Sequence, residues 1–148
     1  MRRFEFDGRV EEKGGQQFVS GRGAYGDGYS RVHRPEPHGF ASSPIAGAKG
    51  LLMPMPGNPD YAFVLGGEHP GKRPSDLPAG GTAIYDSSGN IMKFIGDGIV
   101  VDAGSRTITT TSGGWVLNGP ATINGDLTVN GNIACSGSVV DGDGNNGA

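Results

Sequence analysis

The sequence has little of what anchors or cross-links many small proteins: it has one cysteine, Cys135, and no long apolar run. A single cysteine cannot build a disulfide framework within one chain. A membrane-spanning helix needs about 20 consecutive apolar residues, and no stretch approaches that length. The N-terminus, MRRFEFDGRV, carries an arginine pair but lacks the apolar run of a signal peptide. We therefore expect no intrachain disulfide, no transmembrane helix and no signal peptide.

Positive charge is missing from the end of the chain, because no lysine or arginine follows Arg106. The net charge is only −3, so we expect no specific nucleic-acid binding. The chain changes from a charged N-terminal part to a nearly uncharged part rich in Thr, Asn, Gly and Val. This composition is typical of a narrow fibre whose apolar side chains face an inner axis. Seven of the 12 basic residues lie in the first 34 positions: Arg2, Arg3, Arg9, Lys13, Arg22, Arg31 and Arg34.

The residue patterns of catalytic and metal sites are also missing. The three histidines, His33, His38 and His69, are not spaced as a zinc or iron site requires. Residues 21–26 fit G-x-G-x-x-G, but the glycines that follow oppose the helix that would bind a pyrophosphate. We find no paired-carboxylate motif, nucleophile elbow or histidine-centred triad. We therefore expect a protein that is not an enzyme and that binds no cofactor or metal.

Two isolated features have a structural interpretation. Cys135 lies at an apolar repeat position with no histidine nearby, so we interpret it as a small buried hydrophobe and not a reactive thiol. Asp141-Gly-Asp143-Gly-Asn145 resembles the start of a calcium loop, but it lacks the remaining ligands and the closing glutamate. We interpret residues 141–148 as a polar tip or a flexible tail.

Glycine and proline are abundant, with 29 and 10 residues, and the C-terminal glycines are periodic. From Trp115 the sequence reads WVLNGP, ATINGD, LTVNGN and IACSGS. In each hexad two apolar positions alternate as in a short strand, and Asn-Gly or Ser-Gly supplies the backbone angles of a tight turn. This pattern predicts a β-helix or β-prism. The turn glycines are Gly119, Gly125, Gly131 and Gly137, and the residues predicted to face inward are Trp115, Leu117, Ile123, Leu127, Val129, Ile133 and Cys135.

The number of repeats predicts the oligomeric state. A triangular coil takes three hexads, so about four hexads barely exceed one coil. One chain cannot bury a continuous core with so few repeats, whereas three identical chains wound about one axis can. We therefore predict a homotrimer in which the inward residues of each chain surround a shared axis. The pattern leaves the handedness of this shaft open.

The rest of the chain predicts short strands broken by glycine and proline, without an amphipathic helix. Five such strands before residue 68 favour a small barrel or sandwich, and their number fits an OB-like barrel. We predict an all-β protein with an OB-like barrel at 1–68, a linker at 69–81, a trimeric β-helical shaft at 82–140 and the tail at 141–148. The expected strands are 4–10, 17–20, 29–33, 50–55 and 61–66 in the barrel, and 82–86, 91–95, 99–102 and 106–111 after the linker.

The middle of the chain resembles a known family in the order of several short motifs. This order resembles the central baseplate spike of Mu-like contractile-tail phages, a family related to the baseplate assembly protein V spikes. The resemblance covers residues 35–101 by motif and the hexads by architecture. The motifs are PHGFASSP at 37–44, Gly47, the apolar strand at 51–53, the turn at 56–59, the strand at 62–65, Arg73-Pro74, LPAGGTAIYD at 77–86 and Gly89.

The resemblance implies an N-terminal OB-fold, a trimeric shaft and a pointed C-terminal tip in the tail baseplate of a virion, synthesised in the host cytoplasm. Such spikes plug the tail tube and breach the host outer membrane, and a baseplate hub protein would dock on the barrels. Several such spikes bind iron at the tip through His-x-His, but no histidine follows His69 here. Either the tip is metal-free or another protein caps it through residues 141–148.

Two other classes of protein share parts of this pattern. A hexapeptide-repeat acyltransferase would need many more hexads and a catalytic histidine near them, and the chain has neither. A trimeric receptor-binding or glycan-binding tail fibre would end in a head with exposed aromatic residues. Trp115 is the sole aromatic residue after Phe94 and occupies an inward register position. The spike is therefore the preferred interpretation, and the glycan-binding fibre is the alternative.

Overall fold

The computed structural model describes residues 1–140 and 142, except for the side chains of residues 59 and 60. In this part of the chain every regular element is a strand apart from one 3₁₀ turn, η1 (Ala24–Gly26), so the all-β prediction is confirmed. The chain divides into two units, Met1–Ile108 and Thr109–Ala148. The strands are β1 (Arg2–Lys13), β2 (Gln16–Arg22), β3 (Gly28–His33), β4 (Lys49–Met55), β5 (Asn58–Glu68), β6 (Thr82–Tyr85), β7 (Ile91–Ile95) and β8 (Gly98–Asp102).

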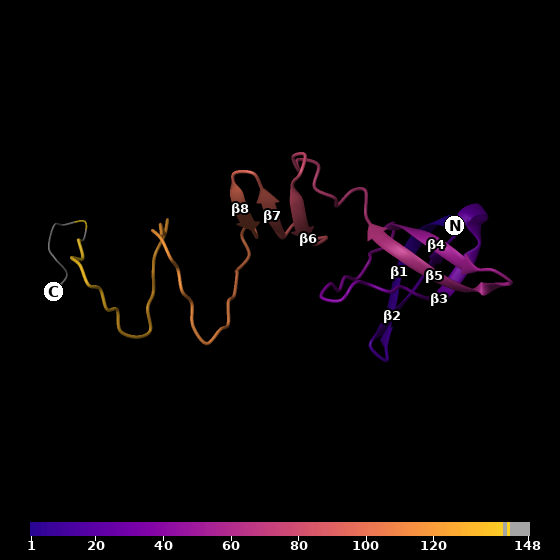
Figure 1. Cartoon of the computed structure of the whole chain (residues 1–148), viewed down its shortest axis with the longest axis horizontal. Helices are drawn as coiled ribbons and strands as arrows, with labels where there is room; N and C mark the ends of the chain where they lie inside the picture. Colours follow the sequence, from indigo (N-terminus) through magenta and orange to yellow (C-terminus); the bar gives the residue numbers. More distant parts are fainter. Residues whose placement is uncertain (141, 143–148) are drawn as a thin grey trace. The chain divides into compact units, whose positions relative to one another are not determined.

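The first five strands form a closed barrel in the order β1-β2-β3-β5-β4 (Figure 1). Strand β1 pairs with both β2 and β4, and the barrel closes where β3 lies parallel to β5 through His33 and Phe63. This Greek-key order is typical of OB-type barrels. The prediction of a five-stranded barrel is therefore confirmed. The observed strands are longer than the expected ones, because glycines within β1 and β5 are accommodated in the ladder and do not end it.

Alternation of side chains along the strands builds the barrel core. In β1, Phe4 and Phe6 point inward while their neighbours are exposed, and their rings meet edge to face with centroids 5.1 Å apart. Burying each such side chain stabilises the fold by about 1.5–3 kcal/mol. Tyr29 of β3 packs against Phe4 from the barrel wall. The buried apolar residues are Phe4, Phe6, Val19, Val32, Ala48, Leu52, Ala62 and Val64.

Two glycines let the barrel strands approach one another closely. A Cβ atom on Gly21 of β2 would lie 2.2 Å from the Glu5 carbonyl oxygen and 2.7 Å from the Phe4 ring. A Cβ on Gly50 of β4 would lie 2.7 Å from the Leu65 carbonyl oxygen. Both glycines adjoin an irregularity in strand register. At these positions glycine is needed for space, because any side chain would collide with backbone that cannot rotate away.

A matched pair of alanine substitutions tests this packing constraint. We expect Gly21→Ala to lower the free energy of unfolding by about 1–3 kcal/mol or more, because the new methyl group overlaps backbone and the Phe4 ring. The control is Gly28→Ala, at the start of β3, where nothing lies within 4 Å of the added Cβ. This control should change stability by no more than about 0.5 kcal/mol. Chemical denaturation measures both, and equal effects would contradict the close approach at Gly21.

Residues 69–81 contain no strand and connect the barrel to a second sheet. This connection is tied to the second sheet through an ion pair of 2.6 Å between Asp76 and Lys93 of β7. At the other end of the sheet, the Asp86 carboxylate accepts hydrogen bonds from the backbone N–H groups of Ser88 and Asn90, which closes the turn between β6 and β7. The Arg106 guanidinium donates to the Ser88 carbonyl oxygen and so holds the same turn.

The second sheet is an antiparallel meander, β6-β7-β8 (Figure 1). Its register places Ile84 opposite Met92, and Met92 opposite Val101. Phe94 lies opposite Ile99 in the same way. Residues directly opposite one another share a face of an antiparallel sheet, so these side chains form one continuous apolar face. We call it the apolar sheet face: Ile84, Met92, Phe94, Ile99 and Val101, with exposed fractions of 57%, 37%, 41%, 66% and 50%.

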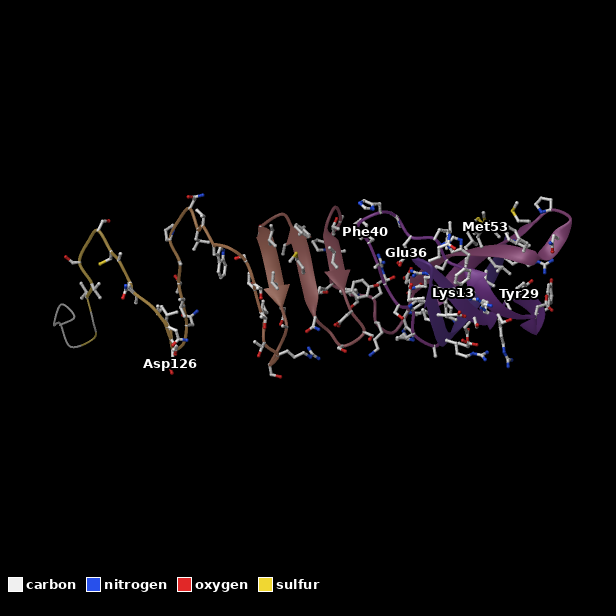
Figure 2. The ribbon with its side chains drawn as sticks, turned by 90° about the horizontal axis from the view of Figure 1, so that it is seen from below. Lys13, Tyr29, Glu36, Phe40, Met53 and Asp126 are labelled. Carbon is white, nitrogen blue, oxygen red and sulfur yellow. The ribbon has the colours of Figure 1, made fainter. Side chains whose placement is uncertain are left out.

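The described residues beyond β8 form an extended trace without strands. The chain bends at Gly119, at 124–125, at 130–131 and at 136–137, which gives the trace its back-and-forth course (Figure 1). Gly119 and Gly125 have φ values of 148° and 155°. Side chains stand away from the trace into solvent, as at Asp126 (Figure 2).

The strand expected at 106–111 is absent, and this prediction is wrong for the single chain. A strand is held by hydrogen bonds to a neighbouring strand. No other described segment of this chain lies alongside residues 106–111 to supply them. The sequence pattern identifies residues suited to a strand, whereas ladder formation depends on a partner.

Candidate functional site

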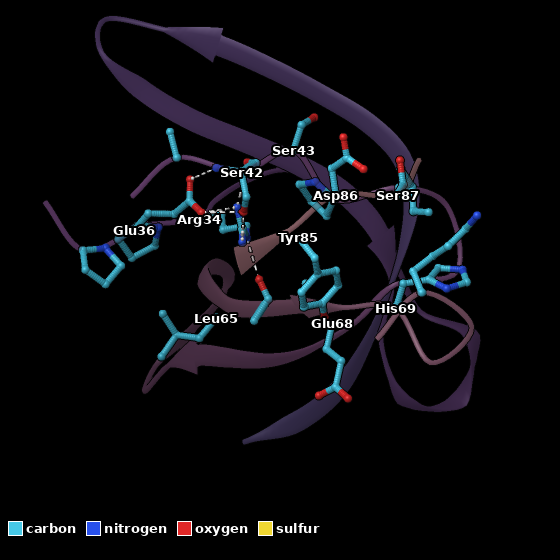
Figure 3. Close-up of a pocket in the computed structure, with 18 residues that line it drawn as sticks. Arg34, Glu36, Ser42, Ser43, Leu65, Glu68, His69, Tyr85, Asp86 and Ser87 are labelled. Carbon is cyan, nitrogen blue, oxygen red and sulfur yellow. Dashed lines mark hydrogen bonds and ion pairs between the residues drawn. The ribbon is translucent and has the colours of Figure 1, made fainter. Parts of the chain in front are cut away.

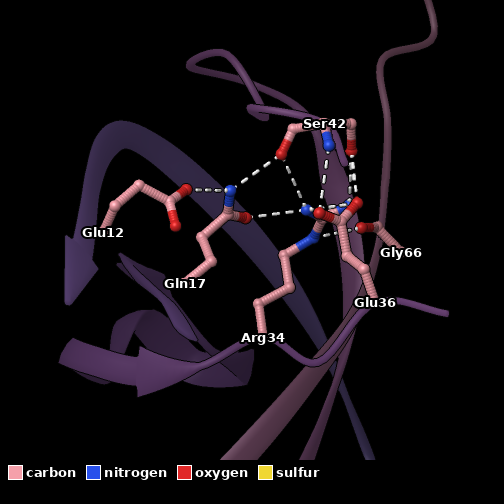
Figure 4. A network of polar contacts seen from close by, with 6 residues as sticks. All are labelled: Glu12, Gln17, Arg34, Glu36, Ser42 and Gly66. Atoms are coloured by element: carbon pink, nitrogen blue, oxygen red, sulfur yellow. Dashed lines mark hydrogen bonds and ion pairs between the residues drawn. The ribbon is translucent and has the colours of Figure 1, made fainter. Parts of the chain in front are cut away.

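A buried arginine at the end of β3 organises one end of the barrel (Figure 4). The Arg34 side chain is 8% exposed, and its guanidinium donates hydrogen bonds in several directions. Nε donates to the Gly66 carbonyl oxygen at 2.7 Å, Nη1 to Gln17 Oε1 at 2.7 Å, and Nη2 to Ser42 Oγ at 3.0 Å. Nη1 also forms an ion pair of 3.0 Å with Glu36. The planar fork of arginine suits such convergent acceptors.

The acceptors around Arg34 are themselves connected. The backbone N–H of Ser42 donates to Glu36 Oε2 at 3.0 Å, and its hydroxyl donates to Glu36 Oε1 at 2.7 Å. Gln17 Nε2 donates to Glu12 Oε1 at 2.7 Å and to the Ser42 carbonyl oxygen at 2.8 Å. No buried side-chain nitrogen or oxygen in the described part of the chain lacks a partner. We call this set the Arg34 network: Glu12, Gln17, Arg34, Glu36, Ser42 and Gly66.

The electrostatics of Glu36 reflect this network. Burial of the carboxylate opposes its charge, but the hydrogen bonds from Ser42 and the nearby Arg34 charge outweigh burial and lower the pKa of Glu36. A carboxyl whose pKa is lower in the folded chain stabilises the fold at pH above its unfolded pKa. That stabilisation is lost as the pH falls through the folded pKa.

The Arg34 network fixes a loop that contributes little to the barrel core. This loop, residues 35–44, carries Phe40, which is 65% exposed. The backbone N–H of Phe40 donates to the Pro37 carbonyl oxygen at 3.1 Å, forming a turn. Prolines at 35, 37 and 44 restrict the backbone further. A large apolar side chain is thus displayed in solvent on a loop with little freedom, which is the arrangement of an interaction anchor.

Removing the arginine tests how strongly the loop depends on it. We expect Arg34→Ala to lower the free energy of unfolding by about 3–5 kcal/mol, because the Glu36 carboxylate and the Gly66 carbonyl oxygen lose their buried partner. The control is Arg9→Ala, whose exposed guanidinium contacts Asp7 two residues away. This change should leave the free energy of unfolding close to that of the unchanged chain, because solvent screens an exposed ion pair. Denaturation curves compare the two, and an Arg34→Ala protein as stable as the control would contradict the role of the network.

A cavity of about 800 Å³ lies beside the Arg34 network (Figure 3). Its walls include loop 35–44, the end of β5, and Tyr85, Asp86 and Ser87. Three of its polar groups are already engaged: Arg34 in its network, the Asp86 carboxylate in its turn, and His69 Nδ1 in accepting from the Gly71 N–H at 3.1 Å. Among residues 1–140 and 142, no three His, Cys, Asp or Glu side chains come together as a metal site.

A row of aromatic side chains crosses the outside of the barrel. Phe18 of β2 and His33 of β3 have ring centroids 5.6 Å apart, and His33 and Phe63 of β5 are also 5.6 Å apart. Tyr61, 59% exposed, continues the row at 5.7 Å from Phe63. The Arg31 guanidinium lies 5.8 Å from the Phe18 ring centroid. We call these four rings the outer aromatic row. Cross-strand pairing positions its members, so its geometry is as rigid as the barrel.

The backbone conformation at Arg31 directs its side chain toward the outer aromatic row. Arg31 has a positive φ of 54°, unusual for a residue with a side chain, and it lies in the register irregularity between β2 and β3. Its backbone N–H faces Ser20 Oγ at 3.4 Å, and its guanidinium is paired with Glu11 at 2.9 Å. The bulge therefore turns a cation toward the aromatic surface.

The sequence-predicted inward residues of the hexads are not brought together in the single chain. The apolar ones are exposed, from 44% at Val129 to 80% at Trp115. Cys135, expected to be buried, is an exposed free thiol whose Sγ–H donates to the Gly137 carbonyl oxygen at 3.2 Å. One chain supplies no second surface to cover it, so burial of Cys135 in a trimeric shaft stays a prediction. Whether other copies cover these positions stays a prediction.

The remaining predicted positions are placed as follows. The chain bends at all four turn glycines, but Gly131 and Gly137 do so without a positive φ. Asp141, Asp143 and Asn145, interpreted as tip residues, lie outside the described residues. The apolar sheet face was missed, although apolar residues dominate its strands, at 91, 92, 94 and 95 and again at 99–101.

The fold is a closed barrel that carries exposed aromatic side chains, followed by a segment whose apolar residues are uncovered. Residues 8–71, which span most of the barrel, match the family described as Bacteriophage Mu Gp45, N-terminal. This match over the barrel supports a Mu-like baseplate assembly protein V family. A family of this kind implies a structural component of a phage tail. No curated protein sequence matches the chain. No described helix is long and apolar enough to span a bilayer.

Proposed function

We propose that the chain is the central spike at the distal end of a contractile tail baseplate, assembled as a homotrimer that plugs the tube and helps to breach the host outer membrane. The observation that carries this proposal is the contrast between the two units of the chain. The barrel covers its own core, whereas the segment from Thr109 on leaves its periodic apolar residues in solvent. A tail protein with this division needs further copies of itself to complete its fold.

The apolar sheet face supports this need for other copies. Its five large side chains are 37% to 66% exposed, although they lie side by side in a regular three-stranded sheet. The opposite face is better covered in β6 and β7, where Ala83, Tyr85, Ile91 and Ile95 are all half-buried. A three-stranded sheet with one uncovered apolar face gains stability when that face packs against another sheet. Three copies about one axis would bring three such faces together.

The hexad segment supports a shared axis in a second way. Its bends divide the trace into short extended pieces whose backbone groups have no ladder partner among the described residues. Neighbouring chains would supply those partners at each level, and a closed three-chain ladder has few free edges. The absence of lysine and arginine after Arg106 fits side chains that approach a common axis, where like charges would repel.

The oligomeric state tests the proposal. Light scattering after size exclusion should give three times the chain mass of 15.2 kDa, about 46 kDa. Val129→Asp should abolish this assembly, because it would place three carboxylates around one level of the axis. The matched control is Thr128→Asp, one position away on the outward register, which should assemble as the unchanged chain does. A folded monomer would contradict the trimer, and a trimeric Val129→Asp variant would contradict the inward register.

We further propose that a baseplate hub protein docks on the barrels and that it binds them through contacts with loop 35–44. Phe40 supplies an exposed apolar anchor, and the Arg34 network holds the loop in place before any partner arrives. Fixing a loop in advance lowers the entropy lost on binding. At the other end, the tail at 141–148 either forms a metal-free tip or is capped by a separate tip protein.

Complementation tests the docking proposal in a phage that lacks this gene. Phe40→Ala, supplied in trans, should reduce the yield of infectious particles by about tenfold or more, since an anchor side chain contributes at least 1–2 kcal/mol to binding. The control is Tyr25→Ala, which removes a second exposed aromatic side chain from the barrel, on η1 outside the loop. Both variants should keep the mass of the unchanged protein. Equal yields from both would exclude loop 35–44 as the docking element.

A further inference from the structure

Three of the predicted hexad turns contain the dipeptide Asn-Gly, whose side chain and backbone can react with each other. Asn118-Gly119, Asn124-Gly125 and Asn130-Gly131 recur at the same position of successive hexads. An asparagine side-chain amide lies within reach of the backbone nitrogen of the next residue. Glycine has no Cβ to obstruct that nitrogen or to restrict the backbone angles that the approach requires. The fourth hexad has Ser136 in place of asparagine and cannot react in this way.

The structure leaves these three sites open to that reaction. Asn118, Asn124 and Asn130 are exposed, and within the described residues no hydrogen bond holds their side chains or the N–H groups of the glycines that follow. An ideal Cβ built on each of the three glycines meets nothing within 4 Å. Asn90 is a contrast, because its side chain donates to Asp86 Oδ2 at 2.6 Å and its backbone N–H is bound to the same carboxylate.

We propose that Asn118, Asn124 and Asn130 are sites of spontaneous deamidation in the unassembled chain, and that assembly protects them. The backbone nitrogen of the glycine attacks the side-chain Cγ of the asparagine and forms a five-membered succinimide. The glycine N–H proton is lost, and the side-chain nitrogen leaves as ammonia. Water then opens the ring at either carbonyl, which gives aspartate or isoaspartate. No oxidant, enzyme or cofactor is consumed.

Each product changes the corner where it forms. The new carboxylate adds a negative charge to a segment without any lysine or arginine, so no nearby cation of this segment can compensate it. Isoaspartate also lengthens the main chain by one carbon, because the backbone then runs through the side chain. A lengthened corner shifts the apolar residues that follow by a fraction of a repeat. Both changes weaken a shaft built from identical hexads.

The protective part of the inference rests on the proposed trimer. Cyclisation requires the asparagine and glycine backbone to rotate until the glycine nitrogen faces the side-chain carbonyl. In a three-chain ladder the strands on both sides of a corner are fixed by hydrogen bonds, which removes that freedom. Deamidation of the three asparagines is therefore slow in the assembled trimer and fast in the unassembled chain.

The experiment follows deamidation site by site in the full-length chain. Assembled protein and single chains, the latter obtained by size exclusion at low concentration or by mild dissociation, are incubated at mildly alkaline pH and sampled over time. Peptide mass spectrometry measures the small mass gain when an amide becomes an acid, and isoaspartyl methyltransferase labels isoaspartate. In single chains we expect residues 118, 124 and 130 to react about tenfold or more faster than Asn90 and Asn132, because those three precede glycine whereas Asn90 and Asn132 precede isoleucine.

Asn132 is the matched internal control, since it is exposed in the same segment two residues from Asn130 but precedes Ile133. Gly119→Ala should slow the reaction at Asn118 and leave Asn124 unchanged as a reference in the same molecule. Reaction at the three sites no faster than at Asn132 would overturn the site assignment. Assembled protein that deamidates as fast as single chains would overturn the protection. A wrong oligomeric state is detected separately by the measured mass and leaves the single-chain rates interpretable.

Discussion

Every part of this chain depends on whether its backbone hydrogen-bonding groups find a partner strand. In the barrel the ladder closes on itself, because β1 pairs on both edges and β3 meets β5. A closed ladder leaves no edge and encloses the space where Phe4, Phe6 and Leu52 pack. Beyond β8 the same chain has residues suited to strands and no partner for them. The difference between the two units is one of pairing, since both have apolar residues at regular intervals.

Uncovered apolar surface also remains where strands do pair, because pairing β7 with β8 satisfies backbone groups and leaves a face of the sheet open. Ile99 and Val101 in the last strand are more exposed than any residue of the barrel core, although their side chains are as apolar. Leaving several such side chains in water costs about 1.5–3 kcal/mol each relative to burial. The family that the barrel matches implies a phage tail component, which operates within a larger assembly. We therefore read the uncovered faces as surfaces meant for other copies, which is the basis of the proposed trimer.

The sequence predicted the barrel well, because strand signals there coincide with real partners in the same chain. The glycines at 21 and 50 look like strand breaks in the sequence, yet they are the positions where strands pass closest. The Arg34 network could not be foreseen, since it joins Gln17, Ser42 and Gly66 from separate elements around one side chain. The strand at 106–111 was wrongly expected for the opposite reason: its residues suit a strand, but pairing is a property of the assembly and not of the segment.

In the hexads, the same Asn-Gly dipeptide determines both the turn geometry and the susceptibility to deamidation. A turn between short strands favours asparagine followed by glycine, because both tolerate backbone angles that other residues avoid. The same freedom lets the glycine nitrogen reach the asparagine side chain when nothing holds the corner. A repeat that uses this dipeptide three times therefore gains sharp corners and acquires reactive sites with them. The turns keep their geometry without deamidating if assembly fixes them soon after synthesis. Natural selection can therefore act on how long the chain stays unassembled. Rapid association would then matter for the chemical integrity of the shaft as well as for its stability.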